Sequence, residues 1–272
     1  MKKSSAKNLA GGLLWLCDEG RGIGMLQSQA KLPGGVLTRL KDYEIEAWLR
    51  SPDEYRDIYV LGKQPTSPNW RQMAQYAVNH ILNDCHAIPP KQRSTAAVLQ
   101  RIYERWKINP GLFQSKVHYV TVLAAVTDQL LKYFAAQPKD TEPLLLFESF
   151  TAVIQELQLE LSMIFQVAQW TKEGLHIQKI VVNEDPALWN GYVQMMTLFS
   201  CNGFGNLPAK IEWIGLLSGK RRVYYPREKD VAGAVDYMEW VRSGMEKTHL
   251  NPDYSSEEGH RWDCYMMPSI IQ

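Results

Sequence analysis

Residues 157–182 read LQLELSMIFQVAQWTKEGLHIQKIVV, and this stretch decides the fold. From residue 159 to residue 167 every second side chain is apolar, and these side chains are Leu159, Leu161, Met163, Phe165 and Val167. Such alternation is typical of a strand that buries one of its faces. The segment TKEG predicts a turn, and LHIQKIVV predicts a second strand because it is rich in β-branched residues. The stretch therefore predicts a β-hairpin.

Helical periodicity precedes the hairpin, and helices and strands alternate after it. The predicted helices before it cover residues 42–50, 71–85 and 117–134, together with one that Ser94 or Thr95 caps; the helix at 117–134 is predicted to be largely buried. After the hairpin, the pattern predicts helices at 186–200 and 229–245 and strands at 210–217 and 221–225. The predicted fold class is mixed α/β, of the α+β kind, with a central mixed sheet flanked by helices and a helical N-terminal half.

The chain divides into four segments by pattern and composition. We expect an irregular N-terminal segment at 1–40, a helical part at 41–140, a sheet-containing core at 141–250 and an acidic C-terminal tail at 251–272. The first segment contains the turn-like phrases GRGIGM and LPGG. A chain of 272 residues is long enough to bury a full core.

Composition and cysteine usage predict a soluble, cytoplasmic protein. Hydrophobic residues make up 45% of the chain and charged residues 22%, close to the average for folded soluble domains. The four cysteines (Cys17, Cys85, Cys201 and Cys264) are far apart and form no CxxC pair, which favours a reducing compartment. No segment approaches the roughly 18–20 apolar residues of a membrane span, so we expect no membrane partner.

Positive charge is concentrated in two windows although the formal net charge is only +1. Residues 91–107 hold five basic residues and one acid, and residues 207–229 hold six basic residues and two acids. Basic windows of this kind form solvated surface or bind an anionic partner such as DNA or RNA. The second window supplies the predicted nucleic-acid-binding residues: Lys210, Lys220, Arg221, Arg222 and Arg227.

Several phrases resemble, in order along residues 42–250, the RecB-type branch of the PD-(D/E)XK nuclease superfamily, which includes CRISPR-adaptation and helicase-linked nucleases. The phrase YEIEAWLRSPDEYRDIYVLGKQP resembles the opening segment of that branch. The phrase WRQMAQYAVNHILND resembles the helix that carries its first-motif histidine, which here is His80. Further on, WNGYVQMMTLF resembles the helix with the motif glutamine, here Gln194, and KIEWIGLLSGKRRVYYP resembles the closing strands. The resemblance implies a restriction-endonuclease-like core.

The resemblance also implies where catalytic groups belong. Members hold Mg²⁺ with an aspartate at the end of the second strand and an Asp/Glu-x-Lys on the third. Here Gln166, Gln178 and Ile180 occupy the positions of the first acid, the second acid and the lysine. Side chains two apart share a strand face, so we expect Gln178 and Ile180 to point together and the turn to bring Gln166 toward Gln178. Neutral amides bind hard cations poorly, and isoleucine carries no charge.

We therefore predict no catalytic residue, no metal site and no cofactor, with His80, Gln166, Gln178, Ile180 and Gln194 as degenerate positions. Acids that could restore activity from displaced positions are Glu160, Glu173, Glu184 and Asp185. Of these, Glu160 lies well upstream on the strand, Glu173 belongs to the turn, and NEDP at 183–186 is typical of a helix cap.

Some members also bind an iron–sulfur cluster through one cysteine in a Leu-Arg-Cys-Pro phrase and three near the C-terminus. Ser51 replaces the first cysteine, and the tail retains only Cys264, so we predict no cluster.

Our hypothesis from the sequence is an inactive nuclease-like protein that serves as a nucleic-acid-contacting or scaffold subunit of a larger DNA-processing or defence assembly, with protein partners. Two alternatives remain open. One is an active Mg²⁺-dependent DNA nuclease that uses displaced acids, and the other is a pure protein-interaction subunit.

Overall fold

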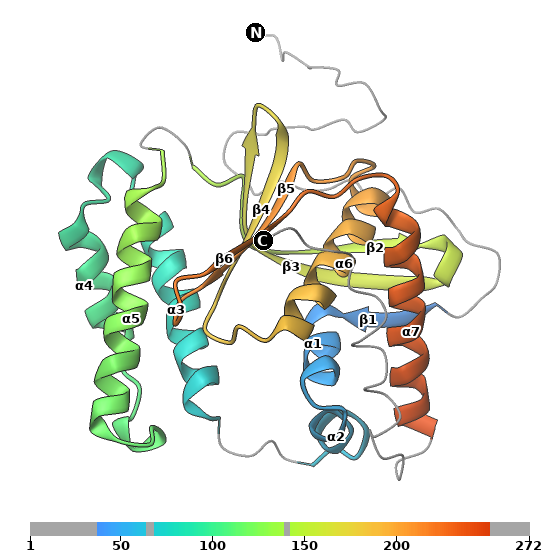
Figure 1. The fold of residues 1–272 in the computed structure, drawn as a ribbon, viewed down its shortest axis with the longest axis horizontal. Coiled ribbons are helices and arrows are strands. Elements are labelled where there is room, and N and C mark those ends of the chain that lie inside the picture. The colour runs from blue at the N-terminus through green and yellow to red at the C-terminus, as the bar shows by residue number, and fades with distance from the viewer. Residues whose placement is uncertain (1–36, 64–67, 139–141, 251–272) are drawn as a thin grey trace, which may run out of the picture. The chain divides into compact units, whose positions relative to one another are not determined.

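The computed structural model describes residues 37–63, 68–138 and 142–250 (Figure 1). Its strands are β1 (Thr38–Lys41), β2 (Leu145–Ile154), β3 (Leu159–Thr171), β4 (Gly174–Val181), β5 (Lys210–Gly215) and β6 (Arg221–Tyr224). Its α-helices are α1 (Asp42–Arg50), α2 (Pro52–Tyr55), α3 (Trp70–His86), α4 (Thr95–Arg105), α5 (Lys116–Ala135), α6 (Pro186–Gly203) and α7 (Asp230–Leu250). The mixed α/β class and the helical N-terminal half predicted from the sequence are confirmed.

The strands form one mixed sheet that is built around the predicted hairpin. β2, β3 and β4 form an antiparallel meander, α6 crosses over to β5, which is parallel to β4, and β6 returns antiparallel to β5. β1 pairs in parallel with the start of β3. Neither β1 nor β2 was predicted from the sequence. The expectation that residues 1–40 are irregular is wrong from Thr38 onward, and residues 1–36 lie outside the described part.

The sheet splits along one edge of β3. On that edge β3 pairs with β1 at Leu159–Ser162 and with β4 at Val167–Thr171. Residues 163–166 lie between these two ladders, and no described strand pairs with them there. A gap in a ladder exposes main-chain groups that need other partners, so the split is a place where side chains must supply hydrogen bonds.

Helices cover both faces of the sheet (Figure 1). α1, α6 and α7 pack on one face in a core cluster that includes Phe165 and Ile177 of the sheet. α3, α4 and α5 pack on the other face in a cluster that includes Val167, Ile180 and Ile214. The sheet is therefore the middle layer of three. Ser94 caps α4 by accepting a hydrogen bond from the Ala97 N–H.

Two expectations about burial are wrong. Leu159, Leu161, Met163 and Phe165 belong to the first cluster, but Val167 belongs to the second, because β3 changes face at Gln166. Opposite Gln166, Phe147 has a positive φ of 52° and also interrupts the pairing of β2 with β3. Helix α5 is buried along one stripe only, since Val117 is 75% exposed. None of the described helices is long and apolar enough to cross a membrane.

Candidate functional site

The strand split is closed by the side chain of Gln166. Its Oε1 accepts a hydrogen bond from the Ile180 N–H at 2.5 Å, and its Nε2 donates to the Ile180 carbonyl at 3.2 Å. The same nitrogen donates to Asn79 Oδ1 of α3 at 2.9 Å. An amide can accept and donate at once, whereas an ionised carboxylate only accepts. Gln166 therefore replaces a missing strand partner in a way that a carboxylate could not.

Helix α3 supplies the other side chain that satisfies the open edge of β4. Gln75 Nε2 donates to the Ile180 carbonyl at 3.0 Å and to Asn79 Oδ1 at 2.9 Å. Gln75 Oε1 accepts from the Val182 N–H at 2.8 Å. Sequence reasoning missed Gln75 and Asn79, because a polar residue on a helix gives no sign that it faces a strand edge. Together with Gln166 they form an uncharged amide network.

Gln178 and Ile180 point to the same face of β4, as expected, because Tyr133, which contacts Gln178, and Ile180 belong to the same core cluster; the surroundings of the two side chains nevertheless differ. Gln178 stands opposite Val167, and its side chain belongs to a second network in which Tyr133 Oη donates to Gln178 Oε1 at 3.3 Å. The side chain of Ile180 is fully buried in the core under α3–α5. Only Gln166 lies in the split itself, and it contacts the main chain of Ile180.

The two helical motif positions lie on opposite faces of the sheet. His80 is half-buried on α3, where its ring packs edge-on against Tyr76 with centroids 4.4 Å apart; the α3 residue that reaches Gln166 is Asn79. Gln194 is half-buried on α6 and donates to Asn190 Oδ1 at 3.4 Å. Because α3 and α6 cover different faces, His80 and Gln194 do not share a site.

Next to the split, β5 carries a buried carboxylate that sequence reasoning missed. Glu212 is only 3% exposed and stands opposite Gln178, whose Nε2 donates to Glu212 Oε2 at 2.8 Å. His176 Nε2 lies 3.1 Å from the same oxygen. Lys210 Nζ and Arg221 Nη1 each lie 3.5 Å from Oε1. We call Glu212, Gln178, His176, Lys210 and Arg221 the Glu212 cluster.

Glu212 is ionised in this environment. Burial alone raises the pKa of Glu212, but the close contact with His176, the hydrogen bond from Gln178 and the charge of Lys210 outweigh burial and lower the pKa to about 2. A carboxylate with this pKa is a fixed negative charge at neutral pH. The signal that could have revealed it is the phrase KIEWIG, in which Lys210 and Glu212 share one face of an otherwise apolar strand.

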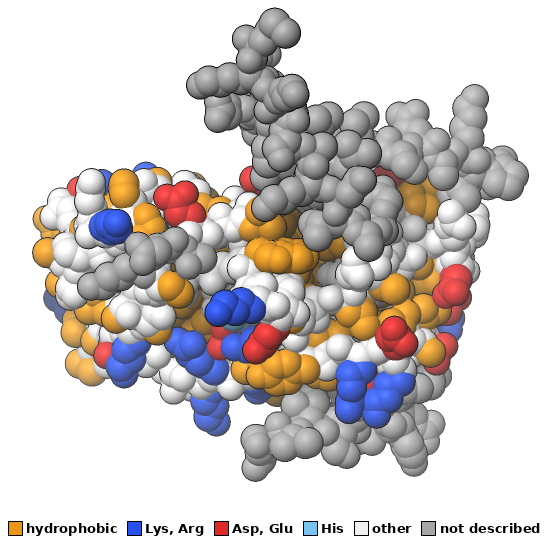
Figure 2. Space-filling view, turned by 90° about the horizontal axis from the view of Figure 1, so that it is seen from above, with side chains coloured by type: hydrophobic (Ala, Val, Ile, Leu, Met, Phe, Trp, Pro, Cys, Tyr) orange, Lys and Arg blue, Asp and Glu red, His pale blue; other side chains and the backbone are white. Residues whose placement is uncertain are grey.

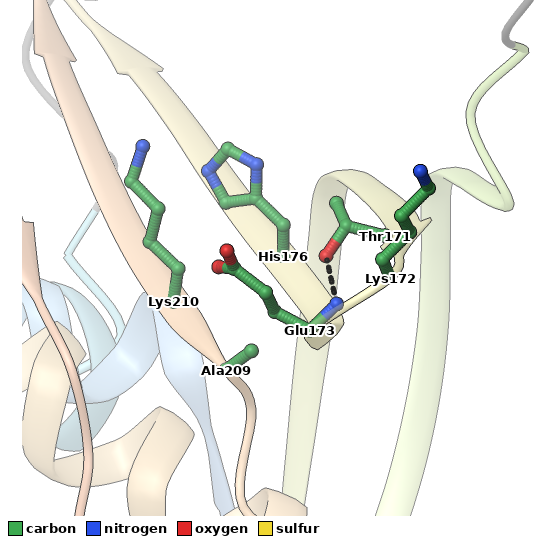
Figure 3. A pocket seen from close by; sticks show the side chains of 6 residues that line it. All are labelled: Thr171, Lys172, Glu173, His176, Ala209 and Lys210. Atoms are coloured by element: carbon green, nitrogen blue, oxygen red, sulfur yellow. Dashed lines mark hydrogen bonds between the residues drawn. The ribbon is translucent and has the colours of Figure 1, made fainter.

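A hollow of about 350 Å³ adjoins the Glu212 cluster (Figure 3). It is bounded by the β3–β4 turn and the start of β5, through Thr171, Lys172, Glu173, His176, Ala209 and Lys210. The His176 imidazole and the Lys210 side chain project side by side from neighbouring strands, and the Glu173 side chain extends toward them from the turn (Figure 3). Lys172 points away from the other side chains. The hollow therefore has a basic wall and one acid opposite it.

The predicted nucleic-acid-binding residues do not form one patch. Lys210 and Arg221 contact Glu212, whereas Arg222 follows Arg221 on β6 and therefore points to the other face of the sheet. Arg227 Nε lies 3.6 Å from Asp230 Oδ2, and Lys220 is exposed in the turn before β6. Seen from above, lysine and arginine side chains are interspersed with acids (Figure 2). Only Lys210 and Arg221 are brought together.

The four displaced acids do not converge. Glu160 pairs with Arg39 at 3.0 Å, and Asp185 caps α6 by accepting from the Ala187 N–H at 2.8 Å. Glu184 accepts from the Leu217 and Ser218 N–H groups at 3.1 and 2.9 Å, and Glu173 lies in the β3–β4 turn. Within residues 37–63, 68–138 and 142–250, no group of three or more His, Cys, Asp or Glu is placed to hold a metal ion.

On the opposite face of the sheet, the structure brings together two acids and a lysine that sequence reasoning also missed. Asp42, at the start of α1, accepts from the Ile164 N–H at 2.8 Å and so satisfies part of the open edge of β3. Lys179 forms an ion pair with Glu46, and its ammonium lies 4.5 Å from the centroid of the Tyr192 ring. Burial lowers the pKa of Lys179 to about 8, against the charge of Asp42, which raises it.

Ser51, where the resemblance would place the cluster cysteine, is the N-cap of α2, and its hydroxyl accepts a hydrogen bond from the Glu54 N–H at 3.2 Å. Cys264 and the predicted acidic tail lie outside the described residues.

Compared with known proteins, the chain matches no family model and no curated protein sequence.

Proposed function

We propose that this protein is a catalytically inactive relative of the RecB-type nucleases that contacts DNA or RNA as a subunit, or serves as a scaffold, in a larger DNA-processing or defence assembly. The observation that carries the loss of catalysis is the double hydrogen bond between Gln166 and the main chain of Ile180. An acid at residue 166 would place a carboxylate oxygen against the Ile180 carbonyl and Asn79 Oδ1, both of which are acceptors.

The order of the strands supports the family part of the proposal. With β2 identified, the hairpin strands β3 and β4 are the second and third strands of a meander, as the resemblance requires. Gln166 on β3 and Gln178 on β4 then occupy the strands on which nucleases of this branch carry their acids.

The basic groups of the Glu212 cluster support nucleic-acid contact. Lys210 and Arg221 have more N–H donors than their contact with one carboxylate uses. Phosphate oxygens are the main targets of lysine and arginine in protein–nucleic acid complexes. The phosphate backbone is common to DNA and RNA, so the proposal covers both.

The activity test is incubation of the full chain with single- and double-stranded DNA and with RNA, in Mg²⁺ or Mn²⁺. We expect no cleavage above that of a buffer control. Cleavage that is lost in Glu46→Gln, Glu160→Ala or Glu184→Ala, with folding retained, would establish the active-nuclease alternative. Cleavage that is equal in all these variants would point to a contaminating nuclease, and repurification to constant specific activity would separate the two.

A protein-interaction role without nucleic acid is the second candidate. It is favoured by exposed aromatic and aliphatic side chains on α3 and α4, where Tyr76, Leu99 and Tyr103 are 62%, 42% and 73% exposed. Exposed apolar groups that adjoin one another are typical of protein interfaces. Affinity purification from the source cell with and without nuclease treatment separates the candidates, because partners held through nucleic acid are lost on treatment.

A further inference from the structure

We propose that the hollow beside the Glu212 cluster binds a phosphate group of the nucleic acid, and that Glu212 is the positioning residue that orients the basic side chains toward it. This inference rests on the nucleic-acid contact proposed above and names the site and the chemical group. Its basis is the convergence of His176, Lys210 and Arg221, which come from three neighbouring strands, on one buried carboxylate.

The charges of the cluster favour an anion. Lys210 and Arg221 together exceed Glu212 by one positive charge, and a phosphodiester carries one negative charge. Lys210 has three N–H donors, of which the contact with Glu212 requires one. His176 lies beside Lys210 on the wall of the hollow (Figure 3). Donors therefore remain for a ligand on the open side.

Buried Glu212 restricts the basic side chains before any ligand arrives. Free lysine and arginine side chains each lose rotamer entropy when they are immobilised, and a preformed ion pair has already lost part of it. Glu212 is ionised at neutral pH, so the pairing persists under physiological conditions. Glu212 is buried and does not line the hollow, which leaves the hollow to the ligand.

The hollow also has a suitable size. Its volume of about 350 Å³ is near the lower end of the ~300–1,000 Å³ range of small-molecule sites. Glu173, on the turn, is the acid that would oppose a bound phosphate, because its side chain extends toward His176 and Lys210 (Figure 3). Removal of the Glu173 carboxylate is therefore expected to strengthen binding of the phosphate, whereas removal of Lys210 is expected to weaken it.

The decisive measurement is fluorescence anisotropy of a labelled single-stranded oligonucleotide with the full chain over a range of salt concentrations. Lys210→Ala is expected to weaken binding about tenfold and to reduce the salt slope by about one. Lys210→Arg should retain binding, and Glu173→Gln should strengthen it. Inorganic phosphate should compete for the wild type and should compete less for Lys210→Ala. Lys63→Ala, which removes an exposed lysine outside the cluster, is the matched control and should change neither quantity.

The variant Glu212→Gln distinguishes two roles of Glu212: orientation of the basic side chains, and simple repulsion between its carboxylate and the phosphate. If Glu212 only reduced the local positive potential, its neutralisation would strengthen binding; if it orients the donors, binding weakens even though the net charge rises. We expect about tenfold weaker binding. Stronger binding would overturn the positioning role. Should Glu212→Gln fail to fold, as judged by circular dichroism, two other variants leave the buried carboxylate in place: His176→Asn tests the wall of the hollow, and Arg221→Ala tests the basic partner of Glu212 that does not line the hollow.

The outcomes separate this inference from the proposed function. If the wild type binds the oligonucleotide but Lys210→Ala, His176→Asn and Arg221→Ala leave affinity and salt slope unchanged, the hollow is not the site, and nucleic-acid contact stands. If the wild type shows no binding at low salt, the nucleic-acid part of the proposed function fails, and the inference fails with it.

Discussion

The side chain of Gln166 binds both main-chain groups of Ile180, accepting from its N–H at 2.5 Å and donating to its carbonyl at 3.2 Å. A side chain thus continues the hydrogen bonding between β3 and β4 past the last paired residues, Val167 and Gln178. The split in the sheet is thereby held at a fixed width by an uncharged group.

Gln166→Glu is the closest change toward a catalytic acid, and we expect it to destabilise the fold without creating activity. The ionised glutamate would be buried, would lose both donated hydrogen bonds and would face the Ile180 carbonyl. A loss of about 2–4 kcal/mol in the free energy of unfolding at pH 8 is expected.

The pH dependence of this variant has a definite sign. Burial among acceptors raises the pKa of the new carboxyl above its unfolded value, so the folded state favours the protonated form and the deficit shrinks as the pH falls to about 5. Urea unfolding at both pH values measures this change. Gln92→Glu, at an exposed position, is the control and should show no such change. A stable variant that cleaves DNA with Mg²⁺ would contradict the prediction.

The lowered pKa of Glu212 predicts that the fold loses stability in acid. Its pKa lies at about 2, below the ordinary value of 4.5, so the ionised form stabilises the fold above pH 4.5 and this contribution is lost as the pH falls toward 2. The gap in the free energy of unfolding between wild type and Glu212→Gln should therefore shrink by about 2–3 kcal/mol between neutral pH and about pH 2. A gap that is constant over this range would show that folding does not lower the pKa of Glu212. Glu228→Gln, at an exposed acid, serves as the control.

The lowered pKa of Lys179 predicts a pH dependence of the same sign in alkali. Its pKa in the fold is about 8, below the ordinary 10.5, so the unfolded chain binds more protons between these values and stability rises with pH. Relative to Lys179→Met, the wild type should gain up to about 3 kcal/mol between pH 8 and pH 10.5. Denaturation at both pH values tests this. Lys132→Met, at an exposed lysine paired with Asp128, should give a nearly constant difference.

The parts of the fold that the sequence predicted are those with a long, regular period. β3 alternates over many residues, and α1 begins and ends at the predicted residues. β2 escaped prediction because Glu148, Ser149 and Thr151 are exposed along it and obscure the alternation. β1 has only four residues, too few to show a period.

The candidate site was less predictable because it depends on how the helices and strands are oriented when they pack against one another. The helical stripe of α3 contains both Asn79 and His80, and only packing decides that Asn79 reaches Gln166. Alternation along β3 could not show that the strand changes face at Gln166, because the irregular residue opposite that position, Phe147 with its positive φ, lies on another strand. The surroundings of Glu212 likewise depend on tertiary packing, since its partner Gln178 also accepts a hydrogen bond from Tyr133 of α5.

Glu184 provides a test of whether a displaced acid is structural. Its carboxylate accepts from the Leu217 and Ser218 N–H groups and from the Ser218 hydroxyl, and so fixes the turn that joins β5 to β6. Glu184→Ala would leave these donors without the carboxylate and should cost about 1–3 kcal/mol in the free energy of unfolding. Glu184→Gln, which keeps an acceptor oxygen, should cost less. Gly215 makes room for this carboxylate, since an added methyl group would overlap it, so Gly215→Ala should reproduce part of the loss. Glu184→Ala could instead leave stability unchanged and abolish a metal-dependent cleavage activity. In that case Glu184 would be catalytic, and the active site would lie at Glu184 rather than at the split that Gln166 closes.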